Sequence, residues 1–113
     1  MKKAYRVRKN EEFSRIISKK HYFTSATFII YADKAKEANS RIGISVSKKL
    51  GDAVIRNKIK RQVRMMFINF YDFDNSDVDL ICIVRSKYME NSFADNLQEL
   101  EKVVKKAIIN KYE

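Results

Sequence analysis

The stretch RIGISVSKKLGDAVIRNKIKRQVR, residues 41–64, contains the features that decide the fold of this chain. Its first seven residues alternate apolar with small or polar side chains, which is typical of a strand with one buried face. Gly51 then interrupts the pattern, and Asp52 is a favourable N-cap for a helix that extends to about Tyr71. We therefore expect a strand, a turn and a long helix in this order.

The expected helix has one apolar face and one basic face. At about 100° per residue, its apolar side chains fall within an arc of about 120°; they are Ile55, Ile59, Val63, Met66, Phe67 and Phe70. The opposite face has Asn57, Lys58, Lys60, Arg61 and Arg64, with Arg56 near the boundary. Asp52 is the only acid between Ser40 and Asp72, so these cations lack the glutamate partners of a salt-bridged solvated helix. Solvated helices also present Lys and Arg, but unpaired like charges favour phosphate as a partner.

Positive charge is concentrated in the same stretch. Eight Lys or Arg residues and one acid occur in it, and the whole chain has a formal net charge of +10. Lys48 and Lys49 add two cations and free backbone amides beside the helix N-terminus, where the helix dipole also favours an anion. A polyanion is the expected partner.

A short helix is expected near the N-terminus. Phe13, Ile16 and Ile17 share one face of a helix over residues 11–19, and Asn10 can cap it. This helix can cover part of a sheet with its apolar face.

Two further strands and a last helix complete the pattern. The β-branched and aromatic residues of 24–32 predict a strand that pairs antiparallel with 41–47, and the apolar run 78–84 predicts a strand covered on both faces. Ser92 to Asp95 fits a capping box that begins an amphipathic helix. The expected order is helix, strand, strand, helix, strand, helix, an α/β (α+β) two-layer sandwich with a mixed sheet.

Length and composition restrict the class of protein. The 113 residues predict one domain, 1–113, with no run of 18 apolar residues and no apolar region behind the basic start that would form a signal peptide. The single Cys82 lies within VDLICIV, so a buried, reduced thiol and a cytoplasmic location are expected. His21 is the only histidine, and no nucleophile motif accompanies it.

An acidic run precedes and enters the predicted strand 78–84. Carboxylates suit hard cations, but the run lacks the spacing of an EF-hand. We expect a solvated loop and no protein-made metal site; the four acids are Asp72, Asp74, Asp77 and Asp79.

The segment GISVSKKLGDAVIRNKIKRQVR resembles the signature of the bacterial ribonuclease P protein subunit. The family pattern G-x-S-V-S-K-K-x-G-x-A-V-x-R-N-x-x-K-R-x-x-R is met from Gly43 to Arg64. The length of the chain, the K-N-E-x-F start of the first helix, the F-x-x-Y pattern and the last amphipathic helix are also similar to the family. The resemblance implies a left-handed crossover through the basic helix, whereas general physics favours a right-handed one.

The resemblance implies a function in a ribonucleoprotein enzyme. Such an enzyme removes the 5′ leader of precursor tRNA, and its RNA subunit does the chemistry with Mg²⁺ that is held mainly by RNA. The implied partners are the catalytic RNA subunit and precursor tRNA, with no DNA and no membrane. The positions implied to bind the RNA subunit are Lys48, Lys49, Arg56, Asn57, Lys58, Lys60, Arg61 and Arg64.

The resemblance also implies a leader-binding cleft between the sheet and the first helix. Its positions are Phe13, Ile17, Tyr31, Ser45 and Ser47. Aromatic faces flanked by cations bind unstacked bases, whereas the residue types alone favour Phe13 and Tyr31 as ordinary core residues.

Four positions depart from the family. Ile17 stands where the family often has an aromatic residue, and it has no π face for stacking. Lys58 stands where many members have Arg, so the charge is kept but the bidentate guanidinium is not. Asp52 stands where relatives often have Asn, and Ala26 where they commonly have Arg.

Two other classes of protein can present a basic helix. A DNA-binding module would show a helix-turn-helix companion or a dimer seam, and the chain has neither pattern. A ribosomal or other structural RNA-binding protein would explain the charge equally well, and the motif of residues 43–64 argues against it.

Overall fold

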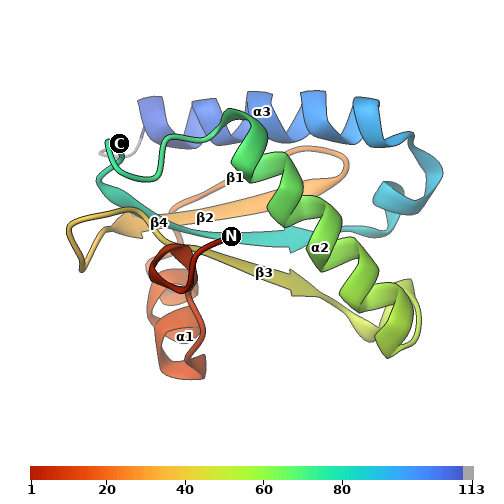
Figure 1. Cartoon of the computed structure of the whole chain (residues 1–113), viewed down its shortest axis with the longest axis horizontal. Helices are drawn as coiled ribbons and strands as arrows, with labels where there is room; N and C mark the ends of the chain where they lie inside the picture. Colours follow the sequence, from red (N-terminus) through yellow and green to blue (C-terminus); the bar gives the residue numbers. More distant parts are fainter. Residues whose placement is uncertain (111–113) are drawn as a thin grey trace.

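One mixed sheet organises the protein, and helices pack on both of its faces (Figure 1). The computed structural model describes residues 1–110, so the last three residues of the expected 1–113 domain lie outside the described part. The elements are η1 (Lys3–Tyr5), α1 (Asn10–Ser18), β1 (Tyr22–Thr24), β2 (Phe28–Lys34), β3 (Ile42–Val46), η2 (Lys48–Leu50), α2 (Ala53–Phe70), β4 (Val78–Val84), η3 (Ser86–Glu90) and α3 (Phe93–Ile109).

The strand order is β1-β2-β4-β3, and this corrects the expected pairing. The strand β4 pairs antiparallel with β2 and parallel with β3, so β3 does not pair with the strand before it. The reason is the burial of β4, which is apolar and covered on both faces and therefore takes a central position. The long helix α2 makes the crossover that parallel neighbours require.

The single strand expected over residues 24–32 is two strands, β1 and β2, joined by a turn. The Ser25 amide donates to the carbonyl of Phe28 at 2.8 Å, and the Ser25 hydroxyl accepts from the Phe28 amide at 3.0 Å. The carboxylate of Glu99 on α3 accepts from the Thr27 amide at 2.8 Å. A serine turn anchored by a helix therefore divides the segment without glycine or proline.

Two of the three expected helix caps are confirmed. Asp52 Oδ1 accepts from the Ile55 amide at 3.1 Å, and Ser92 Oγ accepts from the Asp95 amide at 3.1 Å. The cap predicted for α1 is wrong, although the helix itself is present. Asn10 is the first helical residue, and Lys9 occupies the N-cap position without a side-chain cap bond.

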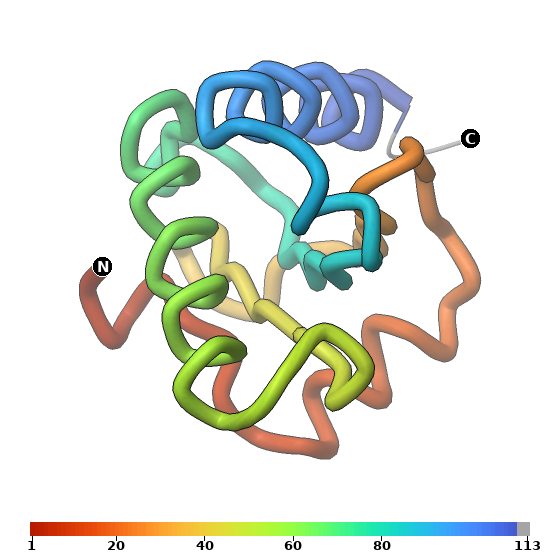
Figure 2. Tube along the Cα trace, turned by 90° about the vertical axis from the view of Figure 1, so that its right-hand side faces the viewer, coloured from red at the N-terminus to blue at the C-terminus, as the bar shows by residue number. Residues whose placement is uncertain are grey.

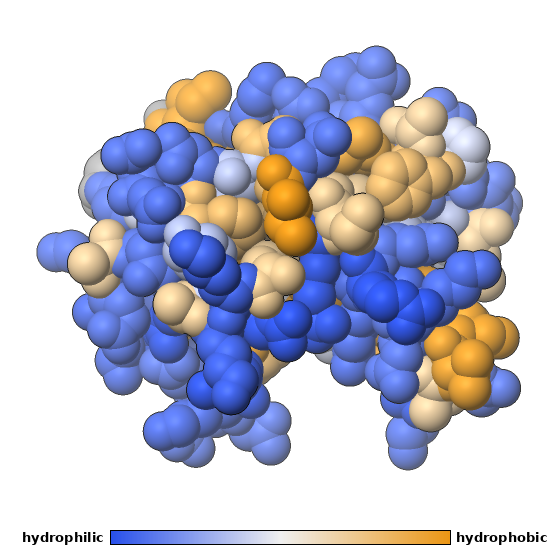
Figure 3. Space-filling model, viewed as in Figure 1, coloured by the Kyte–Doolittle hydropathy of each residue, from blue (hydrophilic) through white to orange (hydrophobic). Residues whose placement is uncertain are grey.

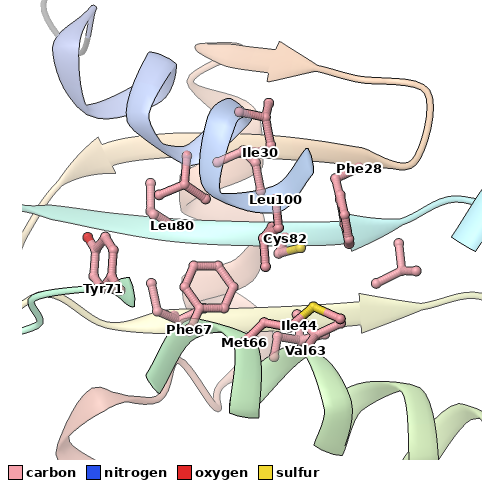
Figure 4. Packing of buried hydrophobic residues seen from close by; sticks show 14 of the residues in the cluster. Phe28, Ile30, Ile44, Val63, Met66, Phe67, Tyr71, Leu80, Cys82 and Leu100 are labelled. Atoms are coloured by element: carbon pink, nitrogen blue, oxygen red, sulfur yellow. The ribbon is translucent and has the colours of Figure 1, made fainter. Parts of the chain in front are cut away.

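The main core lies between the sheet and the helices α2 and α3 (Figure 4). Figure 2 shows α2 and α3 side by side against one side of the sheet, with α1 on the other. Helix α2 contributes the fully buried Phe67, Met66 and Val63, and α3 contributes Leu100. The buried, unpaired Cys82 of β4 confirms the expected thiol, and burial raises its pKa. Within residues 1–110 no helix is long and apolar enough to cross a membrane.

Candidate nucleic-acid interface

The basic helix α2 presents its cations on two different edges. Arg56, Lys60 and Arg64 recur every four residues and are half-buried along the edge nearest β3, whereas Asn57 and Arg61 are exposed. Lys58 lies apart from them, because it lines a pocket of about 270 Å³ with Gln62, Tyr88 and Phe93. The structure therefore divides the cations that the sequence placed on one face.

These cations have no carboxylate partners in the described part of the chain. The ion pairs within residues 1–110 involve Arg15, Lys36, Arg41, Lys87 and Lys105, none of which belongs to α2 or η2. The positive charge of α2 and η2 is therefore not neutralised by carboxylates of the described residues, which is typical of a surface that binds a polyanion.

The turn before α2 holds two exposed cations beside the helix. Lys48 and Lys49 lie on η2, where the Ser47 hydroxyl accepts from the Lys49 amide at 3.2 Å. Gly51 follows with a φ of 148°, a conformation that L side chains rarely adopt, so glycine is required there. The chain thus turns sharply enough to place η2 at the N-terminal end of α2.

Three of the predicted leader positions form one apolar cluster on the sheet face that α1 covers. Phe13 and Ile17 of α1 and Tyr31 of β2 pack, half-buried, around Ile81 of β4. A Cβ at Gly43 would lie 2.7 Å from the Phe13 ring and 2.7 Å from Ile81, so glycine lets α1 approach the sheet closely.

The two predicted serines lie along β3 and just beyond it, next to the apolar cluster and toward η2. Ser45 is two residues after Gly43, so its side chain is on the α1 side of β3, half-buried beside Ile83 of β4. Ser47 lies beyond the strand end, is exposed, and caps η2 with its hydroxyl. The sheet face and the basic turn are therefore adjacent.

A buried ion-pair network fixes α1 on the sheet. Asp79 of β4 is fully buried and accepts from Arg15 Nη2 at 3.1 Å and from Arg41 Nη2 at 2.9 Å. Arg41 also donates to both carboxylate oxygens of Glu12, at 2.6 Å and 3.1 Å, and Arg15 donates to Asp33 at 2.5 Å. Asp79 was expected in a solvated loop, and that prediction is wrong because two guanidinium groups compensate its charge inside the protein.

The network also controls the titration of its carboxylates. Hydrogen bonding from Arg41 holds the pKa of Glu12 below its usual value of 4.5. The same pair raises the pKa of Arg41, with the Glu12 hydrogen bond as the main cause. Both groups are therefore charged at neutral pH.

The other members of the acidic run have neighbours of their own. Asp72 accepts from the Asn75 amide at 3.2 Å, and Asp74 accepts from the Tyr5 hydroxyl at 2.9 Å. Within residues 1–110, no three His, Cys, Asp or Glu side chains are arranged to hold a metal ion.

Two cations that the sequence analysis did not assign join this surface. Arg6 and Arg8 line a pocket of about 410 Å³, the N-terminal pocket, together with Phe13, Lys60 and Arg64. In the space-filling view the molecule is hollowed between α1 and the beginning of α2, and strongly hydrophilic residues gather around that hollow (Figure 3). The alternation R-V-R around the buried Val7 is the signal that could have indicated this placement.

Comparison with known proteins identifies the family. Residues 1–108 match the sequence model of the family described as Ribonuclease P. The chain belongs to the ribonuclease P protein family. A ribonuclease P protein component from Mesoplasma florum is 45% identical over 105 residues, covering 92% of this chain and 96% of the relative, and one from Lactococcus lactis is 39% identical over 93% and 89%.

Solved structures of ribonuclease P proteins share the fold. The Staphylococcus aureus protein is 39% identical, with a TM-score of 0.82 over 96% of this chain and all of that one. The Thermotoga maritima protein is 26% identical, with a TM-score of 0.77 over 89% of this chain and 96% of that one. These comparisons confirm the resemblance and the mixed α+β fold, and they establish the role of ribonuclease P subunit, in tRNA processing and RNA binding.

Proposed function

We propose that the α2 and η2 surface binds the catalytic RNA subunit of ribonuclease P. Its cations are uncompensated within residues 1–110, and Arg forks and Lys charges are the usual partners of RNA phosphates. Arg61 and Asn57 are exposed, and Lys58 offers a contact on the other edge of the helix. The residues of this surface are Lys48, Lys49, Arg56, Asn57, Lys58, Lys60, Arg61 and Arg64.

The sheet face under α1 holds the single-stranded 5′ leader of precursor tRNA. Phe13 and Tyr31 are half-buried and therefore not wholly enclosed by the protein, and a base stacked on such a ring contributes about 1–3 kcal/mol. Ile17 adds van der Waals contact without a π face, and Tyr22, which packs on Tyr31 with ring centroids 5.3 Å apart, extends the aromatic surface. Ser45 and Ser47 provide hydroxyls at the edge nearest η2.

The chemistry of leader removal is supplied by the RNA subunit with Mg²⁺. RNA phosphates would hold the ion, because their oxygens are the ligands that Mg²⁺ prefers, and the described residues contain no arrangement of three His, Cys, Asp or Glu side chains that would compete for it. An ion held there would supply Lewis-acid chemistry for hydrolysis of the phosphodiester, and no residue of this chain is assigned a step in it.

The residues of this chain then act by binding and orienting the substrate. Mature tRNA has no leader, so contacts to Phe13 and Tyr31 favour the precursor over the product. The cations of α2 lower the electrostatic cost of bringing two RNA molecules together. Leader contacts made on a rigid sheet fix the position of the scissile bond relative to the RNA subunit.

The observation that carries the proposal is the row of uncompensated cations beside an aromatic sheet face. The test is the affinity of the protein for a bacterial ribonuclease P RNA at physiological salt. The variant Asn57→Ala/Arg61→Ala removes an amide and a cation four residues apart, and Gln98→Ala/Lys102→Ala removes the same pair of groups from the solvent face of α3. We expect the first variant to lose roughly tenfold or more in affinity and the second to match the unmodified protein. Equal affinities for both variants would contradict the proposal.

A further inference from the structure

The N-terminal pocket lies where the two proposed RNA surfaces meet. Its wall combines Phe13 of the leader face, Lys60 and Arg64 of α2, and Arg6 and Arg8 of the segment before α1. The views agree that this segment passes close to α2 (Figures 1 and 2). Arg6 and Arg8 are not among the residues proposed above to bind the RNA subunit or the leader.

The charges around this pocket are all of one sign. Four cations line it, and no carboxylate of residues 1–110 does. Arg6 Nε is buried and has no hydrogen-bond partner within the described chain. Burial, followed by the positive charge of Arg6, lowers the pKa of the Arg64 guanidinium. Arg6, Lys60 and Arg64 are half-buried and Arg8 is exposed at the rim, so the three half-buried like charges repel one another, and an anion between them would relieve that repulsion.

The backbone holds the arginines in place before any ligand arrives. The Val7 amide donates to the carbonyl of Ile42 at 3.0 Å, and Arg6 forms an isolated parallel bridge with Ile42. The Val7 side chain is buried with Ile16 and Ile81, so the flanking arginines extend to the opposite side of the segment. The site is therefore preorganised.

A neighbouring pocket of about 460 Å³ offers a comparison. It shares Arg6 and Arg8 and also has Lys3 and Lys9, but Glu12 and Glu37 line it as well, and its Arg41 is already paired with Glu12 and Asp79. Carboxylates in the wall repel an anion, so the N-terminal pocket is the better anion site of the two.

We propose that the N-terminal pocket binds a phosphodiester group of single-stranded RNA, with Arg6 and Arg8 as binding residues alongside Lys60 and Arg64. This inference rests on the proposed function and adds two residues and a ligand chemistry to it. The phosphate belongs either to the leader, which Phe13 would contact next to it, or to an unpaired segment of the RNA subunit bound on α2. Both sources present the same chemistry.

The experiment uses the holoenzyme reconstituted from the full chain and a bacterial ribonuclease P RNA. The variants are Arg8→Gln, whose side chain is exposed and so leaves the fold intact, and Arg6→Gln/Arg8→Gln. The control Lys102→Gln/Lys106→Gln removes two exposed cations from α3. Three affinities are measured from 50 to 400 mM salt, a range chosen to resolve the salt slope: protein for RNA subunit, holoenzyme for precursor tRNA, and holoenzyme for mature tRNA.

If a phosphate binds in this pocket, Arg6→Gln/Arg8→Gln should lose roughly tenfold in affinity either for the RNA subunit or for precursor tRNA, and Arg8→Gln should lose less. The slope of log affinity against log salt should fall by about 0.7 for each lost phosphate contact. If the leader supplies the phosphate, only the affinity for precursor tRNA falls. One uncharged methylphosphonate linkage at that position of the leader should then make the unmodified protein and the arginine variants bind precursor tRNA equally. If the RNA subunit supplies it, the affinity for that RNA falls instead.

The inference would be overturned if the affinities and salt slopes of the arginine variants for the RNA subunit and for precursor tRNA match those of the α3 control. The proposed function is tested separately, because Asn57→Ala/Arg61→Ala should still weaken binding to the RNA subunit. A loss with that variant and none with the arginine variants would reject the pocket alone.

Discussion

Replacing Glu12 by Gln should loosen α1 on the sheet in a way that depends on pH. Glu12 accepts two bonds from Arg41, at 2.6 Å and 3.1 Å, and only 15% of its side chain is exposed. Gln can accept one of those bonds but has no charge, so we expect a loss of about 2 kcal/mol in the free energy of unfolding at pH 7. For a domain of this size the midpoint of thermal unfolding should fall by about 8 °C.

The sign of the pH dependence follows from the carboxylate. The pKa of Glu12 is lower in the folded protein than its usual value of 4.5, chiefly because Arg41 donates to it. Its contribution to stability is therefore complete above that usual value and is lost as the pH falls through the lowered pKa. The unfolding midpoints of the Glu12→Gln variant and the unmodified protein should therefore approach each other as the pH falls below that usual value and through the lowered pKa.

The assay is thermal unfolding followed by circular dichroism between pH 3 and pH 8. Glu101→Gln is the matched control, since it removes the carboxylate of the exposed Lys105–Glu101 pair, whose atoms are 2.9 Å apart. Exposed pairs of this kind contribute about 0.3–0.5 kcal/mol, so its midpoint should change little. Equal shifts for the two variants at pH 7, or a difference that persists unchanged at pH 3, would refute the reasoning.

Three further outcomes follow from the same contacts. Ile17→Phe restores an aromatic face beside Tyr31, and the holoenzyme should bind precursor tRNA roughly tenfold more tightly with unchanged affinity for mature tRNA; an equal gain for both tRNAs would reject stacking on the leader. Gly43→Val places a side chain where even a Cβ lies 2.7 Å from Phe13, so precursor affinity should fall further than affinity for the RNA subunit, and equal losses would contradict this geometry. Phe67→Ala empties a fully buried site and should lower the free energy of unfolding by about 3–5 kcal/mol in urea titrations, and a loss under 1 kcal/mol would contradict the described packing.

Local patterns were sufficient for the helices and for the central strand. The cap at Asp52, most of the apolar stripe of α2 and the capping serine of α3 each depend on residues within one or two turns, and the structure confirms them. Ile55 is the exception in the stripe, because it lies in the first turn of α2 and is 37% exposed. The apolar run of β4 likewise predicted a strand covered on both faces.

The pairing of strands depends on contacts that no local pattern encodes. The sequence places 24–32 and 41–47 next to each other along the chain, but β4 inserts between their strands after the α2 crossover. The turn at Ser25 was missed because Glu99 of α3 stabilises it. The Glu99 carboxylate accepts from the Thr27 amide, which is 72 residues earlier in the sequence. The hand of the crossover stays a prediction from the family resemblance.

The residues of the site show the same difference between what local patterns predict and what long-range contacts determine. Phe13, Ile17 and Tyr31 come together as the family resemblance implied. Asp79 was misjudged because an aspartate after a polar loop looks solvated, and its two arginine partners come from α1 and from the residue before β3. Arg6 and Arg8 were missed because their importance depends on the distance to α2, which the sequence does not show.

The most direct test of the central claim is cleavage of a precursor tRNA with a 5′ leader at low Mg²⁺. Three reactions are compared: the protein alone, a bacterial ribonuclease P RNA alone, and the two together. We expect the protein alone to be inactive and the combined reaction to be far faster than the RNA alone, with cleavage at the mature 5′ end of the tRNA. Cleavage by the protein alone, or no acceleration of the RNA despite tight binding to it, would contradict the account.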